Sequence, residues 1–402
     1  MTVRANPPEI SGSHLSADAV PSPLWVLLGL AMAPTVSLGL ARFAYALLVP
    51  AMRHDLAWSY AEAGLLNGVN AVGYLVGALV AARVAARFGA RVSVIACLVV
   101  TCAALLGSGL TASFPVLVAL RTVAGVAGAV AFVAGGGLAA AAGAGVPGRS
   151  ALALSIYVAG AGFGIALSAL AVPAVQARFG WQGGWIALAA VALAASAFGA
   201  AAVARAPSAP PRPLAAADVP VRVMAPVLVS YALFGAGYIA YMTFIIDYLQ
   251  ASLGFAPPAI VLFWTLLGGA AMAGAFAWGH VLGRVRGGRG VVATTALVTI
   301  GAALPVVWTS EIGALVSAAI FGGSFLAVVA AVTSFARTVF PPHAWTAAIG
   351  TLTAAFALGQ CVGPVISGLV ADGAAGVGSG LLLSAGVLAV ATVVALFQRA
   401  TR

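Results

Sequence analysis

The sequence predicts an all-α membrane protein whose twelve transmembrane helices form two pseudo-symmetric six-helix bundles. Three observations lead to this prediction. The chain has 402 residues, of which 63% are hydrophobic and 6% charged, whereas soluble domains carry about 25% charged residues. Twelve apolar segments follow one another along the chain, separated by polar interruptions. The arginines outside these segments are distributed unevenly between alternate loops.

The twelve segments are near or above the roughly 20 residues that cross a bilayer. In chain order they cover residues 24–50, 61–82, 92–111, 114–143, 150–173, 182–204, 223–249, 257–282, 290–309, 311–336, 345–371 and 377–398. Lipid offers no water to backbone N–H and C=O groups, so these segments must form helices or a closed barrel. Because the runs are continuous and lack strict apolar–polar alternation, we expect helices.

The arginines predict the orientation of the chain in the membrane. Apart from Arg53 and Arg178, every arginine outside the segments lies in a chain end or in a loop that follows an even-numbered segment. The positive-inside rule makes those loops cytoplasmic. We therefore expect a multi-pass protein of the cell inner membrane with both termini in the cytoplasm.

A Pro-rich polar stretch at 205–222 divides the segments into two sets of six. Proline stiffens such a stretch, and we interpret it as a cytoplasmic linker between an N-terminal bundle at 24–204 and a C-terminal bundle at 223–402. Residues 1–23 are rich in proline and serine and contain no apolar core. They are predicted to form a disordered cytoplasmic tail rather than a cleaved signal peptide.

The two sets of segments are also weakly alike in sequence. Ala44-Tyr45 in the first segment recurs as Ala240-Tyr241 in the seventh, and Gly73 recurs as Gly269 at the same offset. Duplicated halves with a binding site between them are typical of secondary transporters.

Several other classes of protein are disfavoured. The three cysteines lie in apolar runs without metal-ligand or redox spacing, and no GxxxxGK[ST] loop for nucleotide binding occurs. The membrane segments contain no paired base and nucleophile of the kind a catalytic site needs. The arginines are scattered singly instead of forming the basic face of a nucleic-acid binder. We expect no enzyme, cofactor, metal site or nucleic-acid partner.

Residues 24–398 resemble the major facilitator superfamily of transporters. The loop Arg87-Phe-Gly89-Ala-Arg91 is similar to the basic half of the family's gate-loop signature, with Ala86 where the signature has an aspartate. Arg121, Gly125 and Ala129 are similar to its fourth-helix pattern. The resemblance implies two rocking halves and a gate loop at Arg87, Gly89 and Arg91. The missing aspartate leaves open how the cytoplasmic gate is latched.

Within the superfamily, the stretch from Gly39 to Tyr45, followed by Pro50, looks like the YbfB/YjiJ-type branch. That resemblance implies a fold and a type of reaction but no particular cargo.

Two arginines inside the apolar segments are the main candidates for substrate binding. A central arginine costs about 2.5–3.5 kcal/mol on insertion scales, which implies a partner, a cavity or a ligand. Counted from Pro50 and Phe114 at 1.5 Å per residue, Arg42 and Arg121 lie about 12 Å and 10 Å from the outer ends of their segments. Guanidinium forks suit carboxylates and phosphates. The alternative is that both arginines bond helix carbonyls and hold the bundle together.

Other polar and aromatic residues share helical faces with these arginines. Such faces line a substrate cavity or, in the alternative interpretation, form interhelical hydrogen bonds and packing contacts. The predicted binding residues, besides the two arginines, are Tyr45, Asn67, Asn70, Tyr74, Tyr157, Tyr238, Tyr241 and Gln360. Tyr238 and Tyr241 belong to a stripe on the seventh segment that also contains Tyr231 and Tyr248.

None of the eight acidic residues lies deep in a segment, and no histidine relay crosses the membrane. Asp247 and Glu62, at outer segment ends, are the nearest candidates for coupling to a proton or ion. Solvated end caps are the favoured interpretation for both.

Together these features predict a monomeric secondary active transporter that moves a small molecule, in particular an organic anion, through the lipid bilayer by alternating access. Efflux of hydrophobic or cationic compounds is an alternative within transport. A membrane sensor or scaffold that moves nothing is an alternative from another class.

Overall fold

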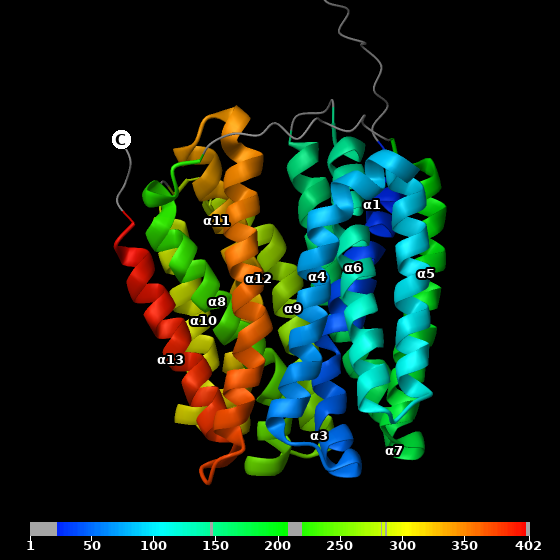
Figure 1. Ribbon diagram of the computed structural model, residues 1–402, viewed down its shortest axis with the longest axis vertical. Coiled ribbons are helices and arrows are strands. Elements are labelled where there is room, and N and C mark those ends of the chain that lie inside the picture. Colours follow the sequence, from blue (N-terminus) through cyan, green and yellow to red (C-terminus); the bar gives the residue numbers. More distant parts are fainter. Residues whose placement is uncertain (1–21, 145–147, 208–218, 283, 286–287, 399–402) are drawn as a thin grey trace, which may run out of the picture.

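The computed structural model describes residues 22–144, 148–207, 219–282, 284–285 and 288–398, and these residues form helices without strands. The predicted tail at 1–23 lies almost entirely outside them, as does most of the predicted linker at 205–222. The described chain begins and ends at one face of the molecule, called here the terminal face, and the other end is called the opposite face (Figure 1).

The first membrane crossing is a broken helix that runs from Leu24 to Leu56. It consists of α1 (Leu24–Leu30), α2 (Met32–Pro34), the π-helix η1 (Thr35–Phe43) and α3 (Tyr45–Leu56). The helix continues past Pro50, the predicted end of the first segment. Arg42 therefore lies near the middle of the crossing, 14 residues or about 21 Å from Leu56, and not 12 Å below the outer end.

Among the described residues, eleven apolar helical stretches are long enough to span a membrane, but one of them, α7 (Arg149–Arg205), contains 57 residues. A straight helix of that length would measure about 85 Å, nearly three times the hydrocarbon core. Gly180 interrupts it with φ 65° and ψ −171°, a conformation that favours glycine. The chain reverses there, so α7 contains two crossings and the twelve predicted crossings are present.

The remaining elements follow the predicted segments closely, and α4 and α11 extend beyond theirs because helices continue into the polar interface. They are α4 (Tyr60–Phe88), α5 (Ala90–Gly109), α6 (Phe114–Ala142), α8 (Val221–Asp247), η2 (Tyr248–Ser252), α9 (Pro257–Leu282), α10 (Arg289–Val307), α11 (Glu311–Val339), η3 (Pro342–Ala344), α12 (Trp345–Ala371) and α13 (Gly376–Leu396).

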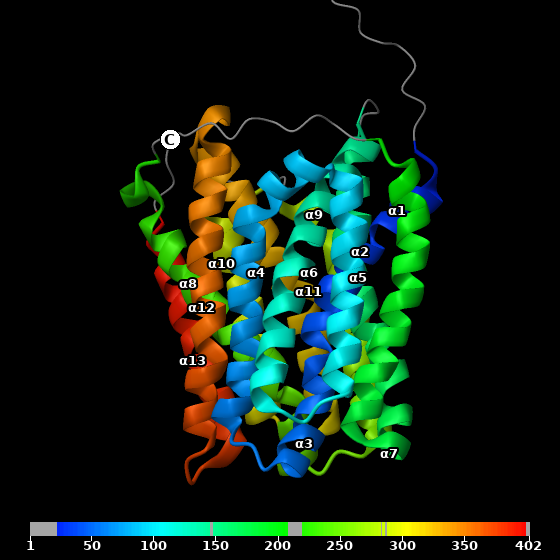
Figure 2. The same cartoon turned by 45° about the vertical axis from the view of Figure 1, so that its right-hand side comes forward.

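The elements up to α7 and those from α8 onward form two halves that meet mainly along three helix pairs. These are α4 with α12, α7 with α9, and α3 with α8, and α4 lies beside α12 in both views (Figures 1 and 2). The α4–α12 crossing is very close, because a β-carbon at Gly64 would collide with the backbone of Pro364. Small residues permit such helix contacts in membranes.

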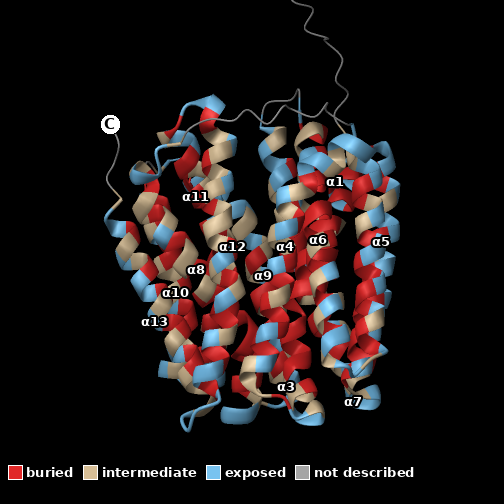
Figure 3. Ribbon diagram, viewed as in Figure 1, coloured by how far each residue is buried: buried red, intermediate tan, exposed pale blue. Residues whose placement is uncertain are grey.

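Burial follows the pattern of a membrane protein. Buried residues lie in the interior of the bundle and between the halves, while exposed residues cover its outside (Figure 3). Many exposed side chains are large and apolar, such as Leu79 at 62% and Leu170 at 64% exposure. Apolar surface of this extent requires lipid around it. The structure is therefore a multi-pass, all-α membrane bundle, as predicted.

Candidate functional site

The site is built on the π-helix in the first crossing. The Thr35 hydroxyl donates to the carbonyls of Ala31 and Gly160, both at 2.9 Å, which ties η1 to α7. Gly39 lies directly against Gly164 of α7, where any side chain would clash with backbone. Widened turns of this kind occur frequently at functional sites. Here the π-helix contains Arg42 and its neighbour Ala41, and the carbonyl of Ala41 accepts a hydrogen bond from Arg121.

Arg121 on α6 is fully buried and largely satisfied. Its Nη1 donates to the Ala41 carbonyl and its Nη2 to Asn67 Oδ1 at 3.4 Å. Its guanidinium carbon lies 4.9 Å from the centre of the Tyr45 ring and 5.5 Å from that of Trp185. Such rings attract cations. Arg121 thus connects the π-helix to α6, as expected if it bonds helix carbonyls and holds the bundle together.

Arg42 is equally buried, at 2% exposure, but has fewer partners. Its Nη2 donates to Gln360 Oε1 at 2.9 Å, and its guanidinium carbon lies 5.2 Å from the centre of the Tyr74 ring. Its Nε has no partner, and its Nη1 bonds no described residue. The ion pairs within the described residues involve Arg53 and His54 only. The charge on Arg42 is therefore not neutralised by any carboxylate among them.

Gln360 and Tyr238 complete a polar chain between the halves. The Gln360 amide nitrogen donates to the Tyr238 hydroxyl, while its oxygen accepts from Arg42. The chain Arg42–Gln360–Tyr238 links the first crossing to α12 and α8. Asn67 provides a second link, because its amide donates to the Thr243 hydroxyl at 2.7 Å. Four predicted residues are thus brought together between the halves.

A group of aromatic rings adjoins this chain. In the C-terminal half, the Phe356 ring centre lies 4.5 Å from that of Tyr231 and 5.6 Å from that of Tyr238, with nearly parallel planes. In the N-terminal half, Tyr74 lies 6.4 Å from Phe132. Phe356 and Phe132 were not predicted. Phe356 precedes Gln360 by four residues, and that helical spacing could have indicated it.

Other predicted binding residues have local structural partners. Asn70 donates to the backbone carbonyl of Arg121 at 2.9 Å, and the Tyr45 hydroxyl donates to the Ala63 carbonyl at 3.1 Å. The Tyr157 hydroxyl donates to the Phe132 carbonyl at 2.6 Å. Tyr241 bonds the Ser317 hydroxyl at 2.7 Å and stacks on Phe321.

Near the opposite face, acidic residues join the two halves. Asp247 is 3% exposed, lies 3.3 Å from Arg53 Nη1 and accepts from the Tyr60 hydroxyl at 2.6 Å. Asp372 accepts the backbone N–H groups of Tyr60 and Ala61, at 2.7 Å and 3.0 Å. The interpretation of Asp247 as a solvated end cap is wrong, because Arg53 and Tyr60 of the other half contact its carboxylate and it is buried. The sequence alone did not show Arg53, Tyr60 or Asp372 as part of this cluster.

Glu62 is an exposed helix cap. Its carboxylate accepts the N–H of Ser59 at 2.9 Å and the Ser59 hydroxyl accepts the N–H of Glu62, which forms a capping box at the start of α4. The end-cap interpretation therefore describes Glu62 correctly.

The predicted gate loop lies at the terminal face. Gly89 adopts φ 83° between α4 and α5, and Arg87 is exposed. Arg91 donates through Nε to the Ala206 carbonyl at 3.0 Å, within the N-terminal half. The loop is thus bonded to the end of α7.

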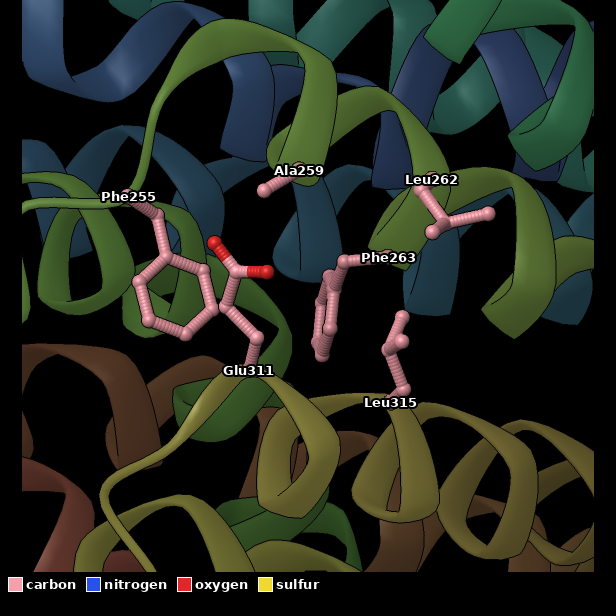
Figure 4. Close-up of a pocket in the computed structure, with 6 residues that line it drawn as sticks. All are labelled: Phe255, Ala259, Leu262, Phe263, Glu311 and Leu315. Atoms are coloured by element: carbon pink, nitrogen blue, oxygen red, sulfur yellow. The ribbon is translucent and has the colours of Figure 1, made fainter.

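A separate small pocket lies between the starts of α9 and α11 (Figure 4). It is lined by Phe255, Ala259, Leu262, Phe263, Glu311 and Leu315. Its only charged group is the Glu311 carboxylate, and none of the predicted binding residues lines it. Within the described ranges, no cluster of three or more metal-ligating side chains occurs.

Twelve crossings in two halves, with charged and amide side chains between them, define a polytopic membrane carrier. The model of the family described as "Uncharacterised MFS-type transporter YbfB" matches residues 33–396, and the chain belongs to this family of the major facilitator superfamily. It is therefore a transporter and not an enzyme, as predicted. No curated protein matches the chain significantly.

Solved structures agree on the fold. A mutant of the nucleoside transporter NupG has a TM-score of 0.73 at 14% identity, over 93% of this chain and 99% of that chain. A bacterial homolog of the human lysosomal transporter Spinster, inward-facing and unoccupied, has a TM-score of 0.71 at 17% identity, over 93% of this chain and 96% of that one. Identities this low establish the fold alone.

Proposed function

We propose that this carrier moves a small organic anion that binds Arg42 between the two halves. The observation that carries the proposal is the guanidinium of Arg42, which has no carboxylate partner among the described residues and, unlike Arg121, uses only one of its two terminal nitrogens. An intramembrane charge without a counter-ion is costly and marks a substrate pathway in many transporters. A carboxylate or phosphate would supply both the charge and the hydrogen-bond acceptors.

Alternating access accounts for the contacts between the halves. The side-chain hydrogen bonds that join them, within the described residues, extend from Arg42–Gln360 toward the opposite face and include the Asp247 and Asp372 clusters. Hydrogen bonds at the terminal face, such as Arg91 to Ala206, stay within one half. The described state is thus tied at the opposite face, and the halves at 24–204 and 223–402 would rock about the Arg42 level.

We assign the terminal face to the cytoplasm and the bundle to the inner membrane, because the arginine distribution obeys the positive-inside rule in this orientation. The opposite face would then be the outer one, and the tied state would open inward. Among the two acidic candidates, Asp247 is the better one for coupling, since its protonation would weaken both the Arg53 ion pair and the tie between halves. We expect the monomer to be the working unit, because the site lies within one chain.

The test is thermal unfolding of the purified chain in the presence of carboxylates, phosphates and lipophilic cations. A ligand at 100 times its dissociation constant stabilises by about 2.7 kcal/mol. We expect stabilisation by anions that is lost in Arg42→Gln and kept in Arg178→Gln, a control at an exposed arginine two residues before the turn at Gly180. Stabilisation by cations that survives Arg42→Gln would support efflux instead. Uptake of the stabilising anion into vesicles would exclude a sensor or scaffold that transports nothing.

A further inference from the structure

We propose that the transported anion is an aromatic monocarboxylate, whose carboxylate binds Arg42 and whose ring packs against Tyr74 and Phe356. This inference rests on the proposed function, because it requires an anion site at Arg42. It adds two properties, a single negative charge and a flat apolar body, and each has its own structural basis.

The single charge follows from the donors that remain free. Arg121 uses both terminal nitrogens on Ala41 and Asn67, aromatic rings lie against its guanidinium, and only its Nε has no partner. Arg42 uses only Nη2, so Nη1 and Nε remain available. One free guanidinium can bind one carboxylate by paired hydrogen bonds. Arg121, the other buried arginine of this half, could offer a second carboxylate only its Nε, because its terminal nitrogens are already bonded.

The flat apolar body follows from the Tyr74 ring beside Arg42 and from the ring pair Tyr238–Phe356, to which Gln360 connects Arg42. In the N-terminal half, the centre of the Tyr74 ring lies 5.2 Å from the guanidinium carbon of Arg42. On the C-terminal side, Gln360 connects Arg42 to Tyr238, whose ring is nearly parallel to that of Phe356 at 13°. Tyr74, Phe132 and Phe356 are only half-buried, so their rings keep accessible surface. Aromatic pairs contribute about 0.5–1.5 kcal/mol beyond their area burial.

The polar groups nearby are mostly occupied, which disfavours sugars and other polyhydroxylated solutes. The Tyr157 hydroxyl is bonded to the Phe132 carbonyl and the Tyr238 hydroxyl to Gln360. The Asn67 amide is bonded to Thr243 and Arg121. A ligand with many hydroxyls would have to displace these bonds, and leaving buried polar groups unpaired is costly. An aromatic ring needs no such partners.

The experiment measures dissociation constants of the full-length purified chain by calorimetry for benzoate, cyclohexanecarboxylate, benzamide and succinate. We expect benzoate to bind most tightly, with cyclohexanecarboxylate about 2- to 10-fold weaker. Benzamide and succinate should bind more weakly than either. In Phe356→Leu the preference for benzoate over cyclohexanecarboxylate should fall, while Phe198→Leu, at a 44% exposed phenylalanine, should keep it.

The outcomes separate this inference from the proposed function. Equal binding of benzoate and cyclohexanecarboxylate, both lost in Arg42→Gln, would overturn the aromatic body and leave the anion carrier standing. Tighter binding of succinate would overturn the single charge. Binding of benzamide as tight as that of benzoate, unchanged in Arg42→Gln, would overturn both proposals. The ratio of ligands on the unmodified chain gives the answer even if Phe356→Leu does not fold.

Discussion

Arg42 and Arg121 are both buried arginines in the N-terminal half, at 2% and 1% exposure, yet their surroundings differ. Arg121 donates to a backbone carbonyl and to Asn67, and two aromatic rings contact it. Arg42 donates to one amide oxygen and has one ring nearby. Burial of a charge inside a membrane therefore does not by itself identify a binding site. The Nε of each has no partner, and the terminal nitrogens distinguish the two: Arg121 uses both, and Arg42 uses one.

Arg53 provides a third case for this comparison. It lies at the end of the same crossing and pairs with Asp247 at 3.3 Å, with its guanidinium carbon 3.2 Å from the centre of the Tyr60 ring. Its charge is neutralised by a carboxylate of the other half. Arg121 thus holds the π-helix against α6, Arg53 joins the two halves through an ion pair, and Arg42 keeps donors available for a ligand.

Replacing Arg121 and Arg42 by methionine should affect the free energy of unfolding differently, and this is the largest difference we expect. Arg121→Met removes hydrogen bonds from a charged donor to Ala41 and Asn67, and should lower stability by about 2–4 kcal/mol. Arg42→Met removes a charge that lacks a counter-ion, so its stability should change by less than about 1 kcal/mol or rise. Thermal unfolding in detergent measures both.

Anion binding should show the reverse order. Arg42→Met should abolish it, whereas any folded Arg121→Met should still bind. Equal destabilisation by the two changes would mean that Arg42 is as structural as Arg121, and the comparison would fail.

An intermediate effect is expected at Asp247. Asp247→Asn removes a largely buried ion pair with Arg53, which should contribute more than the roughly 0.2–1 kcal/mol of a solvent-exposed pair. The population open at the opposite face should therefore rise by at least a few fold. Cys361, which lies at the α4–α12 crossing, is a native reporter of that opening.

The measurement is the rate of maleimide labelling of Cys361 in a variant with Cys97→Ala and Cys102→Ala. The rate should increase in Asp247→Asn and not in Glu62→Gln, since Glu62 caps its own helix and does not contact the other half. An unchanged rate would show that the Asp247 cluster does not hold the opposite face closed.

The fold could be predicted from the sequence because it depends on local properties. Apolar runs of membrane-spanning length predict helices wherever they occur, and the turn at Gly180 lies where two predicted segments are separated. Boundaries such as Pro50 were missed because helices continue into polar interfaces, where hydropathy no longer marks them.

The candidate site could be predicted only in part. An arginine in an apolar segment is conspicuous, so Arg42 and Arg121 were both found. Their difference depends on tertiary partners such as Gln360, which lies 318 residues from Arg42. For the same reason Asp247 was taken as solvated, since its covering partner Tyr60 belongs to the other half. Phe356 was missed because a phenylalanine in an apolar helix is the common case.

The smallest effect is expected at Asn70, which contacts Arg121 and therefore tests whether the surroundings of Arg121 are purely structural. Asn70→Ala removes one hydrogen bond to the backbone carbonyl of Arg121, and interhelical hydrogen bonds in membranes contribute about 0.6 kcal/mol on average. The melting temperature should fall slightly, while the dissociation constant of the bound anion stays unchanged. Weaker anion binding in Asn70→Ala at unchanged stability would show that the α4–α6 contact around Arg121 belongs to the binding site, and the separation of roles between Arg121 and Arg42 would have to be abandoned.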